Sequence, residues 1–287
     1  MAVPVSSNDR GATIVSGATF GIGKAIATLL AERGWPVIAF GLEPSQLEST
    51  HLESAQATSS LPTSVTELQA DADKHGLPLR YLVADLTDPA DISSVAEAAI
   101  QHHGHIHAVV NCAAIGPLGT VLDTDPELWD KIHAVNLKGP FLMCRAVIPH
   151  MKQSGGGRIV NIGSGAGWGK PNMASYAASK AGLTALSAAL ALDHFHDHIA
   201  VNTVIPGGGG IATGMSLSRV DGDLEKLRAS AVGNVAGRYT TGEDVAKAVA
   251  FLLSDDAEAI SGTVIDVGCF AHQGSSVPLP TIKDKPQ

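Results

Sequence analysis

The sequence predicts an α/β fold built on one parallel, doubly wound sheet. Seven short apolar runs rich in β-branched residues recur along the chain, and segments with helical periodicity separate them. The runs are continuous rather than alternating, which is typical of strands buried on both faces of a sheet. Strands that alternate with helices are joined by right-handed crossovers, which place the ligand crevice at the carboxyl ends of the strands. We therefore expect a single Rossmann-type sheet of seven parallel strands.

The seven apolar runs give the expected strands in chain order. They cover residues 12–16, 36–40, 79–84, 107–111, 158–162, 199–205 and 263–267. The helix after the first strand places Ile22, Ile26 and Leu30 on one apolar face, which predicts packing against the sheet. Gly34 follows as the C′ residue that ends this helix.

Residues 42–76 form a long connection between two strands. We expect two short helices there, broken around residues 58–64. Ser64 and Glu67 have the spacing of a capping box, which predicts the start of the second helix. The sequence gives no role for this insert.

The chain shows no internal repeat and no linker, which predicts one domain over residues 1–271. Residues 272–287 contain three prolines and no periodicity. They predict a C-terminal tail, either an extended arm over a neighbour or a disordered end.

Composition excludes several classes of function. Lys and Arg total 19 against 28 Asp and Glu, so the net charge is −9. An acidic chain lacks the basic surface that nucleic acid binding requires. No apolar run reaches the roughly 18 residues of a membrane span, and the start lacks the pattern of a signal peptide. We expect no nucleic acid partner, no membrane and a cytoplasmic location.

A glycine-rich turn joins the first strand to the first helix. Gly17 follows Ser16 directly, and Gly21 and Gly23 come shortly after it. Glycine is required where the backbone turns sharply and approaches a pyrophosphate closely, and the free N–H groups of the following helix attract the anion. The position between a strand and an amphipathic helix predicts a dinucleotide site.

Tyr176 and Lys180 are the strongest catalytic signal. Residues at i and i+4 on a helix share one face. A free Tyr has a pKa of about 10, and a useful base needs a drop of about two to three units. One ammonium about 4 Å away supplies about 4 kcal/mol at an effective dielectric of about 20. We therefore expect Lys180 to lower the pKa of Tyr176, which would act as general base or acid.

These motifs together resemble the short-chain dehydrogenase/reductase family over residues 11–271. The resemblance implies a catalytic tetrad of Asn136, Ser164, Tyr176 and Lys180, with Ser164 on the substrate oxygen. Pro140 has no N–H, so the carbonyl of Asn136 loses its i+4 partner in the helix that starts near Asp125. The family is thought to relay protons through a water at that carbonyl.

The same resemblance implies the residues that contact the cofactor. Cys112 and Ala114 depart from the family pattern after the fourth strand, and the four-glycine run at 207–210 lengthens the spacing to Thr213. The implied contacts are Gly17, Thr19, Phe20, Gly21, Ile22, Gly23, Gly41, Asp85, Leu86, Asn111, Tyr176, Lys180, Gly207 and Thr213.

The cofactor is NAD or NADP. Gly41 occupies the position where an acid would select NAD, and Thr19 and Phe20 replace the basic NADP markers. Glu43 lies nearby and has the wrong sign for a 2′-phosphate, whose burial without a cation would be costly. The negative charge of Glu43 therefore favours NAD. Lys74 in the insert keeps NADP open.

The expected substrate is a small or medium-sized neutral alcohol or ketone rather than a polyanion. The predicted pocket is mostly apolar, with no Arg or Lys pointing inward, and its lining is Ile115, Gly116, Pro117, Gly165, Trp168, Met173 and residues 215–235. The alternatives are an NADPH-dependent reductase of acyl-thioester or quinone-like substrates and a nucleotide-binding protein without turnover. The resemblance also implies a homodimer or homotetramer. We expect no metal, because the histidine clusters lack a partner Cys or carboxylate.

Overall fold

The computed structural model describes residues 10–47, 63–207, 210–229, 234 and 236–268. The predicted tail at 272–287 lies outside these residues, as does most of the predicted helix break at 58–64.

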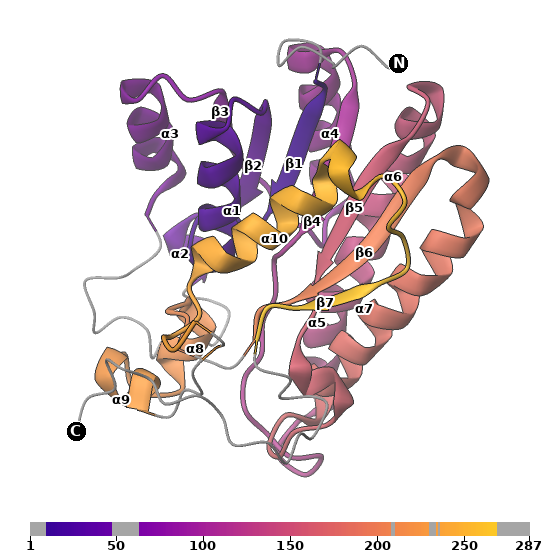
Figure 1. Cartoon of the computed structure of the whole chain (residues 1–287). Coiled ribbons are helices and arrows are strands. Elements are labelled where there is room, and N and C mark those ends of the chain that lie inside the picture. Colours follow the sequence, from indigo (N-terminus) through magenta and orange to yellow (C-terminus); the bar gives the residue numbers. More distant parts are fainter. Residues whose placement is uncertain (1–9, 48–62, 208–209, 230–233, 235, 269–287) are drawn as a thin grey trace.

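The sheet has seven parallel strands in the order β3-β2-β1-β4-β5-β6-β7 (Figure 1). This confirms the predicted fold class. Each predicted strand end lies within one residue of the observed end. The strands are β1 (Ala12–Ser16), β2 (Val37–Gly41), β3 (Leu79–Val83), β4 (Ile106–Asn111), β5 (Gly157–Ile162), β6 (Ile199–Ile205) and β7 (Val264–Asp266).

Strand order reverses between β1 and β4, which form the topological switch point of the sheet. Ligands of doubly wound sheets bind outside the carboxyl ends of the strands at such a point. Here β1 leads into the glycine-rich turn and β4 leads into Cys112 and Ala113. The fold therefore brings the predicted dinucleotide site to the switch point.

Helices cover both faces of the sheet, with one apolar core on each. The helices α1 (Gly21–Glu32), α3 (Val65–Lys74) and α10 (Gly242–Leu253) pack on the face toward the viewer in Figure 1. The helices α4 (Pro89–His103), α6 (Gly139–Gln153) and α7 (Ala174–Asp193) pack on the other. Val15 points into the first core and Ile14 into the second. Burial on both faces explains why the strands are continuously apolar.

The insert between β2 and β3 contains the helices α2 (Pro44–Leu47) and α3. Ser64 Oγ accepts the backbone N–H of Glu67 at 3.2 Å, and the Glu67 carboxylate accepts the N–H of Ser64 at 3.4 Å. The predicted capping box is confirmed. At the end of α1, Gly34 has a φ of +76°, as the predicted C′ position requires.

The helix that carries Asn136 is not one regular helix. It begins as α5 (Pro126–His133), capped by Asp125, and continues through the π-helical segment η4 (Ala134–Lys138) into α6. The N–H of Gly139 donates to the carbonyl of Ala134, five residues back. Because Pro140 cannot donate a helical hydrogen bond, a wider turn at this place is the expected physical response.

The remaining short elements lie in the connections. They are η5 (Gly165–Trp168), η6 (Phe195–Asp197), α8 (Gly214–Ser218), α9 (Leu224–Ala229) and η7 (Asp255–Ala257). Figure 1 shows α8 and α9 below the carboxyl ends of the strands, on the side of the switch point.

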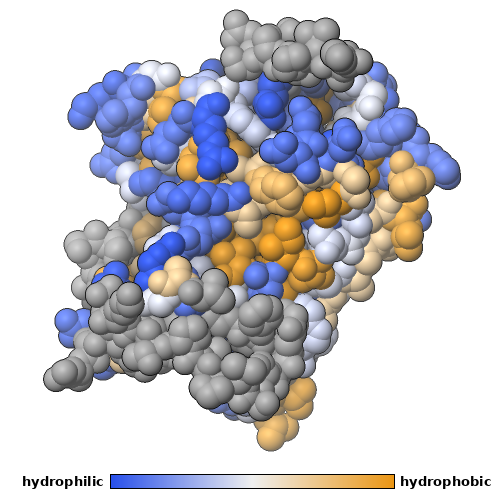
Figure 2. Space-filling model, in the orientation of Figure 1, coloured by the Kyte–Doolittle hydropathy of each residue, from blue (hydrophilic) through white to orange (hydrophobic). Residues whose placement is uncertain are grey.

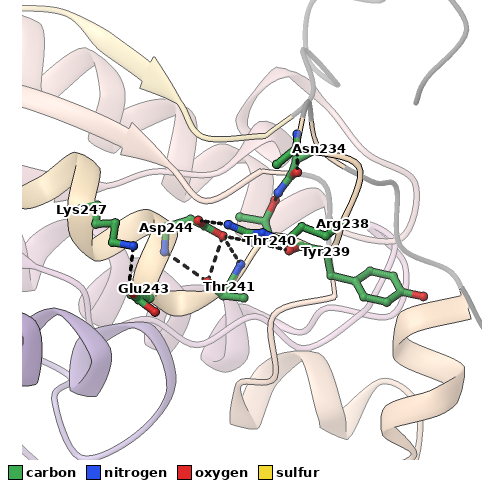
Figure 3. A network of polar contacts seen from close by, with 9 residues as sticks. Asn234, Arg238, Tyr239, Thr240, Thr241, Glu243, Asp244 and Lys247 are labelled. Atoms are coloured by element: carbon green, nitrogen blue, oxygen red, sulfur yellow. Dashed lines mark hydrogen bonds and ion pairs between the residues drawn. The ribbon is translucent and has the colours of Figure 1, made fainter. Parts of the chain in front are cut away.

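A polar network fixes the start of α10 (Figure 3). Thr241 Oγ1 accepts the N–H of Asp244 at 3.2 Å, and the Asp244 carboxylate accepts the N–H of Thr241 at 2.8 Å. Both oxygens of Asp244 also accept from Arg238 at 2.7 Å. This bidentate pair joins the preceding loop to the helix, and its hydrogen bonds from Arg238 hold the pKa of Asp244 below its usual range.

Replacing Thr241 with alanine should destabilise the chain by about 1 kcal/mol, because the first turn of α10 loses its side-chain cap. The melting temperature should fall by about 2–4 °C in a thermal unfolding experiment. Thr241→Ser keeps the hydroxyl and is the matched control. Equal losses in the two variants would contradict the capping role.

Candidate active site

The glycine-rich turn after β1 is a tight crossing of three backbone segments. A Cβ on Gly23 would lie 2.2 Å from the carbonyl oxygen of Gly17, and a Cβ on Gly17 would lie 2.6 Å from Cα of Ala113. Gly17 and Gly21 have φ values of +64° and +58°. Only glycine meets both demands at Gly17, where the backbone is left-handed and the neighbour is main chain.

The N-terminus of α1 has no side-chain cap. Phe20 is the N-cap residue and makes no side-chain cap hydrogen bond, and the first turn contains no acidic residue. The first N–H groups of a helix have no partner within it and carry a partial positive charge. The turn therefore fits the pyrophosphate of a dinucleotide. Thr19 is buried, and Phe20 and Ile22 are half-buried at the same turn.

The end of β2 lies against this turn. A Cβ on Gly41 would approach the side chain of Thr19 at 3.1 Å. The Glu43 carboxylate has a structural partner, because its Oε1 accepts the N–H of Val65 at the start of α3 at 3.2 Å. The acid that we expected to repel a 2′-phosphate thus also anchors the insert.

Asp85 and Leu86 follow β3. Oδ1 of Asp85 accepts both the N–H and the hydroxyl of Thr87 at 2.8 Å, which fixes the carboxylate in a turn. Leu86 is buried, and a Cβ on Gly139 would lie 2.7 Å from its Cγ. The side chain of Leu86 thus packs in the apolar core.

Asn111 ends β4 inside a buried polar chain. Its Nδ2 donates to Oδ1 of Asn161 on β5 at 2.8 Å, and Asn161 donates to Ser187 on α7 at 2.8 Å. This series of hydrogen bonds ties the two central strands to the helix that carries Tyr176 and Lys180. Asn161 and Ser187 were missed by the sequence analysis, since a polar residue inside an apolar run gives no sign of its partner.

Tyr176 and Lys180 both lie on the buried face of α7. Nζ of Lys180 donates to the carbonyl of Ile162 at the end of β5 at 2.8 Å and lies 6.0 Å from the centroid of the Tyr176 ring. Ser164 follows β5 and forms a side-chain hydrogen bond with Tyr176. The three predicted catalytic residues Ser164, Tyr176 and Lys180 are therefore neighbours.

The pKa of Tyr176 is raised rather than lowered, which corrects our expectation. Burial raises it most, while the hydrogen bond with Ser164 and the charge of Arg219 lower it. Lys180 is not among the groups that shift the pKa of Tyr176, and burial lowers its own pKa to about 8. The phenol is therefore held in its protonated form at neutral pH.

Asn136 is fully buried and positions the loop after β4 through its side chain. Its Oδ1 accepts the N–H of Ile115 at 2.9 Å, and its Nδ2 donates to the carbonyl of the same residue at 2.8 Å. Nδ2 also donates to Ser179 Oγ at 3.0 Å, and Ser179 donates to the carbonyl of Tyr176 at 2.7 Å. The sequence analysis missed Ser179, although its i+3 spacing from Tyr176 places it on the same face of α7.

Gly207 and Thr213 bound the connection after β6. Gly207 has a φ of +81°, and a Cβ there would lie 2.1 Å from Cα of Gly268. The hydroxyl of Thr213 caps α8 by accepting the N–H of Ser216 at 3.0 Å. A Cβ on Gly21 would lie 3.0 Å from the methyl of Thr213, so Thr213 stands beside the glycine-rich turn.

The side chains around Tyr176 differ from the predicted apolar pocket in one respect. Met173 and Ala166 pack with the Tyr176 ring, and Met215 joins them. Trp168 is 52% exposed and is not one of the buried side chains of this cluster. Arg219 donates from Nη2 to the carbonyl of Gly116 at 2.8 Å, with its Cζ 5.9 Å from the Tyr176 ring centroid. The expectation that no cation points at this site is wrong, because the turn after α8 folds back over Gly116.

Within the described ranges, no three His, Cys, Asp or Glu side chains gather where they could hold a metal. One histidine cluster has a carboxylate that the sequence analysis overlooked, since Nδ1 of His194 lies 2.8 Å from Asp197, which also pairs with Lys152 at 3.0 Å. Among all the residues that the structure describes, no helix is long and apolar enough to cross a membrane.

Comparisons with known proteins agree with this geometry. The sequence profile of the family described as enoyl-(acyl carrier protein) reductase matches residues 17–269. The chain is 33% identical over 258 residues to 3-oxoacyl-[acyl-carrier-protein] reductase FabG of Thermotoga maritima, covering 88% of this chain and 94% of that protein. It is 34% identical over 256 residues to 2-(S)-hydroxypropyl-CoM dehydrogenase 3 of Xanthobacter autotrophicus, covering 88% and 93%.

A solved structure is similar over the whole fold. The actinorhodin polyketide ketoreductase, in a variant crystallised with NADPH, superimposes with a TM-score of 0.76 at 26% identity, covering 96% of this chain and 100% of that one. The profile, these relatives, the sheet order and the Ser164, Tyr176 and Lys180 cluster all agree. The chain therefore belongs to the short-chain dehydrogenase/reductase family of NAD(P)-dependent oxidoreductases.

Proposed function

We propose that the chain transfers a hydride between a nicotinamide cofactor and a secondary alcohol or ketone, with Tyr176 as general acid and base. The observation that carries this proposal is the meeting of Ser164, Tyr176 and Lys180 beside the switch point. The bound cofactor supplies or accepts the hydride. The chain's own residues hold the substrate oxygen and move its proton.

The proton moves at the phenol oxygen of Tyr176. In carbonyl reduction the phenol gives its proton to the substrate oxygen, and in alcohol oxidation the phenolate takes it back. The raised pKa of Tyr176 favours the protonated form, which is the form that reduction needs. Ser164 orients the substrate oxygen with a second hydrogen bond. Lys180, tied to the carbonyl of Ile162, supplies positive charge beside the ring.

The remaining predicted residues hold the cofactor in this proposal. The N–H groups after Thr19, Phe20 and the glycines of the turn bind the pyrophosphate, and the residues at the ends of β2 and β3 face the adenosine. Asn136 acts as a positioning residue, because its side chain fixes Ile115 and Ser179.

We propose NAD as the preferred cofactor. Gly41, Leu42 and Glu43 follow in order at the end of β2, and the one ionisable residue among them is an acid. A 2′-phosphate there would meet a like charge. The NADPH in the ketoreductase structure supports the alternative, NADP.

A second candidate is the reduction of acyl-thioester ketones, which the names of the FabG relatives favour. A nucleotide-binding role without turnover is less well supported, because all four tetrad residues are present and Ser164, Tyr176 and Lys180 are neighbours.

We also propose a homodimer or homotetramer. Trp129 on α5, Phe141 on α6 and Leu192 on α7 are exposed large apolar side chains. Figure 2 shows a further apolar area where α10 meets β6 and β7, and Phe251 and Val264 are exposed there. Such surfaces favour contact between copies. A cytoplasmic location stays a prediction.

Tyr176→Phe should lower kcat by about 10²–10⁴-fold, because the substrate oxygen loses its proton donor. The measurement is NADH or NADPH absorbance during turnover of a ketone and alcohol panel. Tyr239→Phe is the matched control, since the hydroxyl of Tyr239 has no hydrogen-bond partner within the described residues. A Tyr176→Phe enzyme with unchanged kcat would rule out the proposed chemistry.

The kcat/KM for carbonyl reduction should fall above about pH 8. The pKa of Lys180 is lowered to about 8, so its ammonium is present below that pH and is lost above it. A Lys180→Met enzyme should have low residual activity without this break. Should the break persist in that variant, another group is responsible.

Leu42→Arg should raise the ratio of kcat/KM with NADP to that with NAD by about 10-fold or more. One charge-assisted hydrogen bond to a 2′-phosphate supplies about 1.5–3 kcal/mol. Leu42→Met is the uncharged control. A wild-type enzyme that already prefers NADP would overturn the choice of NAD.

A further inference from the structure

Arg219 lies next to the candidate catalytic tyrosine although it belongs to a different part of the chain. It follows α8 directly, and its Nη2 donates to the carbonyl of Gly116. Gly116 is itself against the tyrosine, because a Cβ there would lie 2.7 Å from Cδ2 of Tyr176 and 2.8 Å from Sδ of Met215. The guanidinium therefore sits at the edge of the apolar cluster around the phenol ring.

The guanidinium is only partly satisfied. It carries five N–H donors, and the hydrogen bond to Gly116 uses one of them. Its Nε is buried without an acceptor. No carboxylate lies within 4.0 Å of it among the residues that the structure describes. A half-buried cation without a counter-charge is unfavourable, and burial lowers its pKa accordingly.

Two other arginines show what is particular about this one. Arg238 forms a bidentate pair with Asp244, which is the usual way of satisfying such a side chain. Arg158 also has a buried Nε without an acceptor, but it lies at the start of β5, the end of the strand opposite Ile162 and Lys180. Of these three arginines, only Arg219 combines free donor groups with a place beside the candidate catalytic tyrosine.

Holding the loop after β4 does not by itself require a cation. A neutral donor such as Gln could make a hydrogen bond to the carbonyl of Gly116. The charge and the unused donors of Arg219 are therefore left for a group that comes from outside the chain.

We infer that Arg219 binds an acidic group of the substrate, so that the preferred substrates are oxo acids or hydroxy acids whose anion lies a few bonds from the reacting carbon. This inference rests on the proposed function, since Tyr176 must face the reacting oxygen. A planar guanidinium binds a carboxylate through two parallel hydrogen bonds, which also fixes the orientation of the substrate. The inferred acidic substrate replaces our expectation of a neutral one.

The kinetic test compares each acid with its methyl ester. Suitable pairs are 3-oxobutanoate and 4-oxopentanoate with their esters, which differ in charge but keep the reacting ketone. The wild-type enzyme should show a kcat/KM at least 10-fold higher for one of the acids than for its ester. Arg219→Gln should lose this preference by lowering the value for the acid, with the ester changed less than threefold. Arg219→Lys should keep part of the preference.

Arg228→Gln is the matched control, because Arg228 is an exposed arginine on α9 in the same region of the chain. It should leave the preference intact. An equal loss in Arg228→Gln would show that general positive charge is responsible, and an equal fall for acid and ester in Arg219→Gln would show a purely structural role. Either result overturns the inference, as does a wild-type enzyme without acid preference.

A binding measurement separates this inference from the proposed function. Calorimetry on the Tyr176→Phe enzyme with cofactor present should give a dissociation constant for the acid at least 10-fold lower than for the ester. Adding Arg219→Gln should abolish the difference. Acid-selective binding without turnover by the wild type would sink the proposed function and keep only the part of the inference that assigns anion binding to Arg219. Turnover of neutral ketones without acid-selective binding would do the reverse.

Discussion

The close backbone approach at the first turn is the constraint on which the rest of the site depends. Gly23 packs against the carbonyl of Gly17, and Gly17 packs against Ala113. This crossing sets the start of α1 at the switch point, with the uncapped N–H groups of the helix directed to the same edge of the sheet as the loop after β4. Any side chain at these two glycines would separate the segments, since the obstacle is main chain and cannot rotate away.

Buried hydrogen-bond networks hold α7, the helix that carries Tyr176 and Lys180, against the same sheet. One network of hydrogen bonds runs from Asn111 through Asn161 to Ser187. The other runs from Asn136 through Ser179 to the backbone of Tyr176. Both cross between elements that are distant in sequence. Buried hydrogen bonds of this kind are costly to leave unmade, so they define one position of α7 against the sheet. The positions of Tyr176 and Lys180 therefore depend on buried side chains from distant parts of the chain.

Local patterns predicted the fold well because each pattern has a local cause. Continuous apolar runs gave the strands to within one residue, and the capping box at Ser64 gave the start of α3. The Tyr176 and Lys180 pair was visible because both residues lie on one helix. By contrast, the raised pKa of Tyr176 depends on how deeply α7 is buried, and burial of a given side chain is a property of the assembled molecule. Arg219 was missed for the same reason, since 103 residues separate it from the carbonyl that it contacts.

The contact between Gly21 and Thr213 joins the glycine-rich turn to the segment that carries Met215 and Arg219. The methyl of Thr213 occupies the space that a side chain at position 21 would need. The glycine-rich turn and the start of α8 therefore pack directly against each other, and a side chain at position 21 would require Thr213 to shift. A chimaera that places α8 in another scaffold must therefore also have glycine at position 21. Otherwise the side chain there would displace Thr213 and the start of α8.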